Sequence, residues 1–140
     1  MVAALNERKN PFNLVVTGEA ETWRPALDQI VGPRWLSLHR VHGDQELLEV
    51  VESGQADAAV LDDAADWRID VLHLLRMIRR LDALLPVVVI TGRRDRRWLE
   101  DALRLAAFSV VVRPLALEEL LRQIQRMMVR LDRAMRGDME

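Results

Sequence analysis

The segment DAAVLD at residues 57–62 is a short apolar run that ends on an acid. Two similar runs follow it, PVVVITG at residues 86–92 and FSVVVRP at residues 108–114, and segments with helical periodicity separate the three. Short apolar runs that alternate with helices are typical of a parallel sheet with helices on both faces. The carboxyl ends of such strands meet at one edge, where ligands bind. The polar side chains at these ends are therefore expected to share one site, and they are Asp62, Thr91 and Arg113.

The rest of the chain completes a pattern of five strands and five helices. The strands are predicted at residues 12–17, 35–41, 58–61, 87–91 and 108–112. The helices are predicted at residues 21–31, 44–53, 71–84, 95–107 and 117–135. Right-handed crossovers and five such units favour a doubly wound, flavodoxin-like α/β sheet in the order 2-1-3-4-5. We expect one domain over residues 12–128, a polar arm at residues 1–11, and an extension of the last helix with a tail at residues 129–140.

Composition narrows the class of protein. The chain has 140 residues, of which 50% are hydrophobic, and a net charge of −2, so no overall charge directs it to nucleic acid or to a membrane surface. It contains no cysteine, which excludes disulfides and thiolate metal sites. No apolar run reaches the roughly 18–20 residues that span a bilayer, and the first residues do not form a signal peptide. We expect a cytoplasmic protein without a membrane partner.

Several motifs occur together in the order and spacing of a known family. They are HGDQELLEVVESGQADAAVLD at 42–62, IDVLHLLRMIRRL at 69–81, TG at 91–92 and RP at 113–114. With them, residues 12–128 resemble the response-regulator receiver family. The resemblance implies that Asp62 is the acid that accepts a phosphoryl group from a histidine kinase. It also implies a Mg²⁺ ion held by two acids after the first strand, and a switch hydroxyl at Thr91.

The sequence departs from this family where the metal should bind. Thr17 and Gly18 occupy the positions of the two acids, and Glu19 is the acid that comes next. Mg²⁺ prefers carboxylate ligands and neutralises charge during phosphoryl transfer, so one displaced carboxylate replaces two poorly. Arg113 stands where the family has lysine, and a planar guanidinium is not an equivalent cation. Val110 stands at the position of the aromatic switch residue.

These departures predict an atypical receiver, or pseudo-receiver, that acts without phosphorylation as a protein-interaction or dimerisation module. It would not be an enzyme and would need no cofactor or metal, and Asp62 would pair with Arg113. The alternative is an active phosphoacceptor that uses Asp62, Mg²⁺ and a histidine kinase. A third class is a module that binds an anion or a small ligand at the same edge.

The run RRDRRW at residues 93–98 offers positive charge for an acidic partner surface, and its arginines are Arg93, Arg94, Arg96 and Arg97. A solvated helix start explains the same run. Nucleic acid is not expected, because acids interrupt the patch and no binding motif is present. Trp67 lies in a polar loop beside the predicted site and is expected to line it or to anchor a partner. Partial burial is the simpler explanation for this side chain.

The last predicted helix carries an unusually long apolar stripe, which runs from Leu117 to Met135 at three- and four-residue steps. Leu131 and Met135 extend it past the length that a receiver needs to cover its sheet. A partner helix would cover the extension, and we expect a homodimer built on the helices at 95–107 and 117–135. A frayed tail is the alternative.

Overall fold

The protein is described by a computed structural model over residues 12–17, 23–31, 36–64, 67, 70–113 and 117–136. The predicted arm at residues 1–11, Glu19 and the end of the tail lie outside these residues. The strands are β1 (Phe12–Val16), β2 (Leu36–Arg40), β3 (Ala58–Asp62), β4 (Val87–Thr91) and β5 (Ala107–Val112). The helices are α2 (Arg24–Val31), α3 (Asp44–Glu52), α4 (Val71–Leu81), α5 (Arg96–Ala106) and α6 (Leu117–Arg136).

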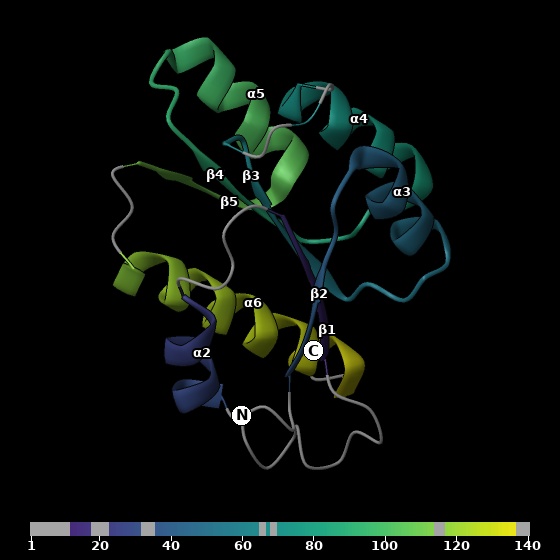
Figure 1. Ribbon diagram of the computed structural model, residues 1–140, viewed down its shortest axis with the longest axis vertical. Coiled ribbons are helices and arrows are strands. Elements are labelled where there is room, and N and C mark those ends of the chain that lie inside the picture. The colour runs from purple at the N-terminus through teal and green to yellow at the C-terminus, as the bar shows by residue number, and fades with distance from the viewer. Residues whose placement is uncertain are drawn as a thin grey trace.

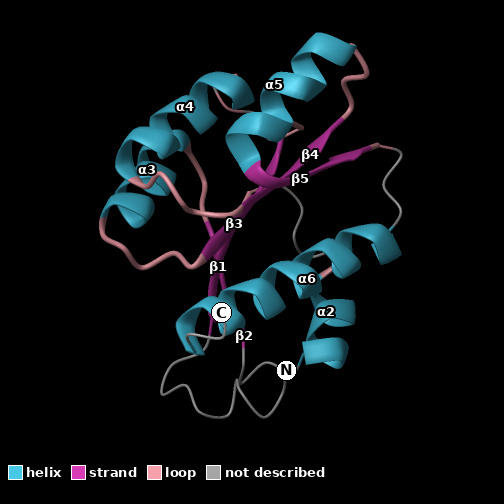
Figure 2. Cartoon of the chain, turned by 180° about the vertical axis from the view of Figure 1, so that it is seen from behind, coloured by secondary structure: helices cyan, strands magenta, loops and turns pink. Residues whose placement is uncertain are grey.

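The five strands form one parallel sheet in the order β2-β1-β3-β4-β5, which confirms the predicted fold. Helices α2 and α6 cover one face, and α3, α4 and α5 cover the other (Figures 1 and 2). This arrangement leaves the carboxyl ends of β1, β3, β4 and β5 at one edge of the sheet.

The two faces of the sheet each bury an apolar core, because successive side chains of a strand point to opposite faces. In β1, Leu14 and Val16 pack on the α2 and α6 side, whereas Val15 packs on the other side. The strands β3 and β4 alternate in the same way. Their inner positions are apolar on both faces, which is characteristic of a parallel sheet covered by helices.

Helix ends follow local signals in the sequence. Gly54 ends α3 with a positive φ of 77°, and its N–H donates to Val51 O at 3.1 Å. Asp70 caps α4, since its carboxylate accepts the N–H of Leu72 at 3.1 Å. The predicted end of this helix at residue 84 is wrong. The helix ends at Leu81 because the apolar stripe that contacts the core stops at Ile78.

Helix α6 is as long as predicted, but Leu131 does not extend past the domain. Its side chain is partly buried and packs against the core between the sheet, α2 and α6. The expectation of an exposed extension is therefore wrong at Leu131, because the long helix crosses the sheet obliquely and its last turns still meet the domain (Figure 2). The side chain of Met135 lies outside those described. In the described part of the chain, no helix is long and apolar enough to cross a membrane.

Candidate functional site at the strand ends

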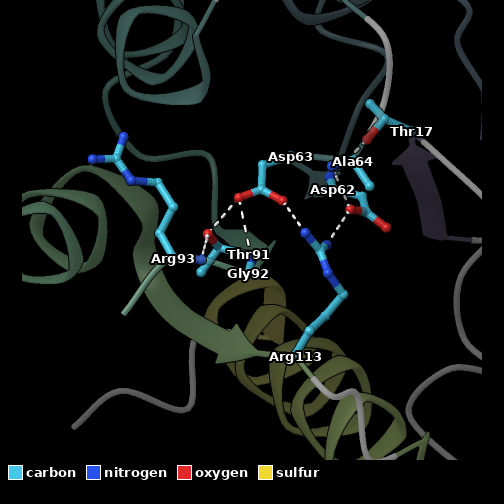
Figure 3. A network of polar contacts seen from close by, with 8 residues as sticks. All are labelled: Thr17, Asp62, Asp63, Ala64, Thr91, Gly92, Arg93 and Arg113. Carbon is cyan, nitrogen blue, oxygen red and sulfur yellow. Dashed lines mark hydrogen bonds and ion pairs between the residues drawn. The ribbon is translucent and has the colours of Figure 1, made fainter. Parts of the chain in front are cut away.

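The predicted convergence of strand ends is present. Asp62 is the last residue of β3 and lies beside Ile90 of β4, one residue before Thr91. Arg113 follows β5, and its N–H donates to Thr91 O at 2.7 Å. Figure 3 shows the side chains of Asp62 and Arg113 turned toward each other, with Thr91 close by and turned toward Asp63. Parallel pairing alone brings these residues together from positions far apart in the chain.

Arg113 bridges two carboxylates. Its Nη1 lies 2.7 Å from Asp62 Oδ1, and its Nη2 lies 2.5 Å from Asp63 Oδ1 (Figure 3). The side chains are 32%, 18% and 16% exposed for Arg113, Asp62 and Asp63, so water screens the pairs only in part. Burial opposes the charge of Arg113, but hydrogen bonds and charges from Asp63 and Asp62 outweigh it and raise the pKa of this guanidinium. The predicted ion pair between Asp62 and Arg113 is confirmed.

Asp63 is the residue that the sequence analysis missed as part of the site. Its Oδ1 receives Arg113, and its Oδ2 accepts the hydroxyl of Thr91 and, at 3.3 Å, the N–H of Gly92. Thr91 is fully buried, and its Oγ1 also accepts the N–H of Arg93 at 3.0 Å. A second acid directly after the strand-ending Asp62 was the available signal. The hydroxyl of Thr91 is thus held by a carboxylate of its own chain.

Thr17 takes a structural role at the end of β1. It is 3% exposed, and its Oγ1 accepts the backbone N–H of Asp62 at 2.8 Å. The carboxylate of Asp62 turns the other way, where Oδ1 also accepts the N–H of Ala64 at 2.8 Å. The hydroxyl of Thr17 therefore ties the ends of β1 and β3 together without adding negative charge.

These residues do not fit a Mg²⁺ ion. Asp62 and Asp63 both engage a guanidinium, and Thr17 supplies a neutral oxygen where the family would have a carboxylate. Among the described residues, no group of three or more acids or histidines is arranged to hold a metal. Glu19 lies outside the described residues.

Gly92 makes room for the guanidinium. A Cβ atom at this position would lie 3.0 Å from Arg113 Nη2, which is closer than side chains normally approach. A glycine directly after Thr91 therefore leaves space for the side chain of the arginine that follows β5. The guanidinium of Arg113 lies next to Gly92, and a side chain at this position would have to displace it slightly.

Trp67 lies beside this site, as the sequence predicted. It is partly buried against the core under α3, α4 and α5. It lines a cavity of about 400 Å³ together with Asp62 and Asp63. Its use as a partner anchor stays a prediction.

The arginine run is exposed, but nearby acids and carbonyls already engage part of it. Arg93 pairs with Asp95 at 3.2 Å and stacks over the ring of Trp98 at 4.9 Å. Arg94 donates to the backbone oxygen of Arg113 at 2.8 Å. The remaining arginines are Arg96, which pairs with Glu100 at 3.0 Å, and Arg97, which is exposed. The run is thus a partly neutralised start of α5 that borders the site.

Comparison with known proteins identifies the family to which this fold belongs. Residues 14–125 match the response regulator receiver domain family. The response regulator MprA of Mycolicibacterium vanbaalenii is 28% identical over 120 residues, which cover 86% of this chain and 52% of that protein. MprA of Mycobacterium avium is 28% identical over 119 residues, with 85% and 52% covered. The chain therefore spans about half the length of these relatives.

Solved structures show the same fold. The receiver domain of the TMAO respiratory system response regulator TorR superposes with a TM-score of 0.68 at 21% identity, covering 86% of this chain and 99% of that one. A signal receiver domain of an HD domain-containing protein from Pseudomonas fluorescens Pf-5 gives a TM-score of 0.71 at 17% identity, with 93% and 95% covered.

Proposed function

The chain belongs to the response regulator receiver domain family of two-component signalling, and we propose that it is an atypical member that works without phosphorylation. In this proposal it is a protein-interaction module with no catalytic activity of its own. The observation that carries the proposal is the bridge from Arg113 to Asp62 and Asp63. It engages Asp62 with the cation that stands at the position of the family's lysine, while Thr17 stands at the position of a metal-binding acid and supplies no carboxylate.

Two features of the site, the bridge and the neutral side chain of Thr17, oppose phosphorylation in this proposal. Asp62 would have to act as a nucleophile, and a carboxylate that accepts a charged hydrogen bond is a weaker nucleophile than a free one. Transfer of a phosphoryl group also needs charge neutralisation and alignment of the donor. Thr17 contributes only its hydroxyl to the backbone of Asp62, and no carboxylate.

The switch hydroxyl supports the same proposal. Thr91 donates to Asp63 and is fully buried, so its present partner already satisfies it. Turning toward a phosphoryl group on Asp62 would break this bond and leave an oxygen of Asp63 with one donor fewer. The hydrogen bond from Thr91 to Asp63 thus supports a receiver that works without phosphorylation.

We expect no phosphorylation of the wild-type chain by acetyl phosphate and Mg²⁺. Intact mass spectrometry should show no added phosphoryl group. Tryptophan fluorescence, to which Trp67 beside Asp62 contributes, should show no saturable response to low-millimolar Mg²⁺. The triple variant Thr17→Asp, Gly18→Asp, Arg113→Lys restores the family's acids and lysine and serves as the comparison. A phosphoryl adduct on the wild type that disappears in Asp62→Asn would contradict the proposal and establish the phosphoacceptor alternative.

The proposed partner is another protein, such as a signalling kinase or a second copy of this chain. Helices α5 and α6 flank the edge strand β5 and present exposed apolar side chains, namely Leu103 at 52% and Leu117 at 39% exposure. Leu131 was expected to contact the partner, but it packs on the chain's own core. Leu103 and Leu117 therefore take its place in the proposed interface. The exposed arginines at the start of α5 add positive charge for a partner with an acidic surface.

We expect a dimer at micromolar concentration in sedimentation velocity, and Leu103→Glu should weaken it at least about tenfold by placing a charge in an apolar interface. Leu84→Glu is the matched control, because Leu84 is 87% exposed and lies in the connection between α4 and β4. A monomer at all concentrations, or equal effects of the two variants, would exclude a homodimer on this face and favour a different protein partner.

A further inference from the structure

A groove lies between the start of β5 and the second half of α6, at the opposite end of β5 from Arg113. Its volume is about 590 Å³, within the usual range for ligand pockets. The side chains that give it its chemistry are Phe108 and Ser109 of β5, and Gln125, Arg126, Val129 and Arg130 of α6. The groove shares no residue with the site at the strand ends, so it is a separate feature of the molecule.

The charge of this groove is positive. Arg126 and Arg130 line it, whereas no acid of the described residues does. The two arginines are four residues apart, so they lie one turn apart on the same face of α6. Both are exposed, and neither forms an ion pair within the described part of the chain, in contrast to Arg122, which pairs with Glu119 at 2.8 Å. Two unneutralised guanidinium groups in one groove attract an anion.

The floor of the groove is apolar and holds one of the two cations in place. Phe108 and Val129 are half-buried, and Phe108 packs against the core under α2 and α6. The guanidinium of Arg130 lies over the ring of Phe108, 5.5 Å from its centroid. This contact restricts the side chain of Arg130 before any ligand arrives, which reduces the entropy lost on binding.

Neutral hydrogen-bond donors complete the lining. The hydroxyl of Ser109 and the amide of Gln125 form no side-chain hydrogen bond with the described residues. The neighbouring amide of Gln123 is engaged, because it donates to Glu119 at 2.7 Å. Guanidinium groups beside further donors match the oxygens of a phosphate group, which accept several hydrogen bonds at once.

We infer that this groove binds a small organic phosphate that carries a ring. Arg126 and Arg130 donate to the phosphate oxygens, with Ser109 and Gln125 as neutral donors, and the ring packs on the apolar floor. Inorganic phosphate fills only part of the groove and leaves the floor in water. The inference goes beyond the proposed function, since it uses neither Asp62 nor the exposed leucines of the proposed interface.

The probe is phenyl phosphate, which carries nearly two negative charges at pH 7.5. Titration into the full chain labelled with ¹⁵N should shift the backbone amide signals of Phe108, Ser109 and Arg126 and saturate at millimolar concentration. The indole signal of Trp67, which packs on the opposite face of the sheet, should stay in place. Phenol, which lacks the charge, should shift none of these signals. Inorganic phosphate, which lacks the ring, should bind at least about threefold more weakly.

Variants test the two arginines. Arg126→Gln and Arg130→Gln should each weaken phenyl phosphate about three- to tenfold. Arg122→Gln is the matched control, because it removes the same charge from the same helix outside the groove, and it should change the affinity less than about twofold. Thermal unfolding without probe shows that each variant is folded. Unmoved signals of Phe108 and Ser109, equal effects of the three variants, or equal affinity for inorganic phosphate would overturn the inference, and the groove would then be a basic surface without a ligand of this class.

Discussion

Replacing Arg113 with methionine should lower the free energy of unfolding by about 2–4 kcal/mol. Removing one partner of a buried ion pair costs about 3–5 kcal/mol, because a charge is left without compensation. Here two carboxylates lose their partner at once, but all three side chains keep 16–32% of their surface in water, which reduces the cost. Urea unfolding followed by tryptophan fluorescence measures the change.

A mutant cycle measures how much the bridge contributes to the free energy of unfolding. It combines Arg113→Met with Asp62→Asn, with Asp63→Asn and with both. The variant that lacks all three charges should be more stable than Arg113→Met alone, since it strands no carboxylate. Arg97→Met is the matched control, because Arg97 is an exposed arginine of the same region and its loss should stay within about 0.5 kcal/mol. Coupling near zero between Arg113 and both acids would mean that the bridge does not stabilise this edge.

Replacing Arg79 with methionine should cost about 2–3 kcal/mol, although the residue lies far from the site. Its guanidinium donates to Leu105 O at 2.6 Å, Ala106 O at 2.8 Å and Asp82 O at 3.1 Å. It therefore closes the end of α5 and ties it to α4. Burial lowers the pKa of Arg79, and the charge of Asp82 opposes this effect in part. Loss of the fork leaves three carbonyl oxygens without this donor.

The control for this prediction is Arg80→Met, which changes the exposed neighbour on the same helix. Arg79→Lys keeps the charge but cannot reach three oxygens at once, so it should recover less than half of the loss. If Arg79→Met and Arg80→Met unfold at the same urea concentration, the hydrogen bonds to α5 contribute nothing measurable.

The fold followed from the sequence because its signal is repeated and local. The inner strands are short apolar runs, the edge strand β2 alternates apolar and polar residues, and each helix has an apolar stripe. Parallel topology then requires the strand ends to converge. The order β2-β1-β3-β4-β5 and the meeting of Asp62 with Arg113 both follow from this rule. The sequence placed the end of α4 too late and expected Leu131 to be exposed. Both errors arose because the sequence does not show which side chains at the end of a helix still contact the core.

The sequence by itself determined which residues arrive at the site, since strand order and strand length place them. The sequence also predicted that Asp62 pairs with Arg113, whereas only the tertiary structure decided how Asp63 and Thr91 join them. Asp63 became the partner of Thr91 because the chain turns directly after β3, and Gly92 left space for the guanidinium between the two acids. The direction of a side chain at a strand end is set by packing and hydrogen bonding with residues distant in the chain. The cavity beside the strand ends arises from the same three-dimensional packing, and no local pattern in the sequence encodes it.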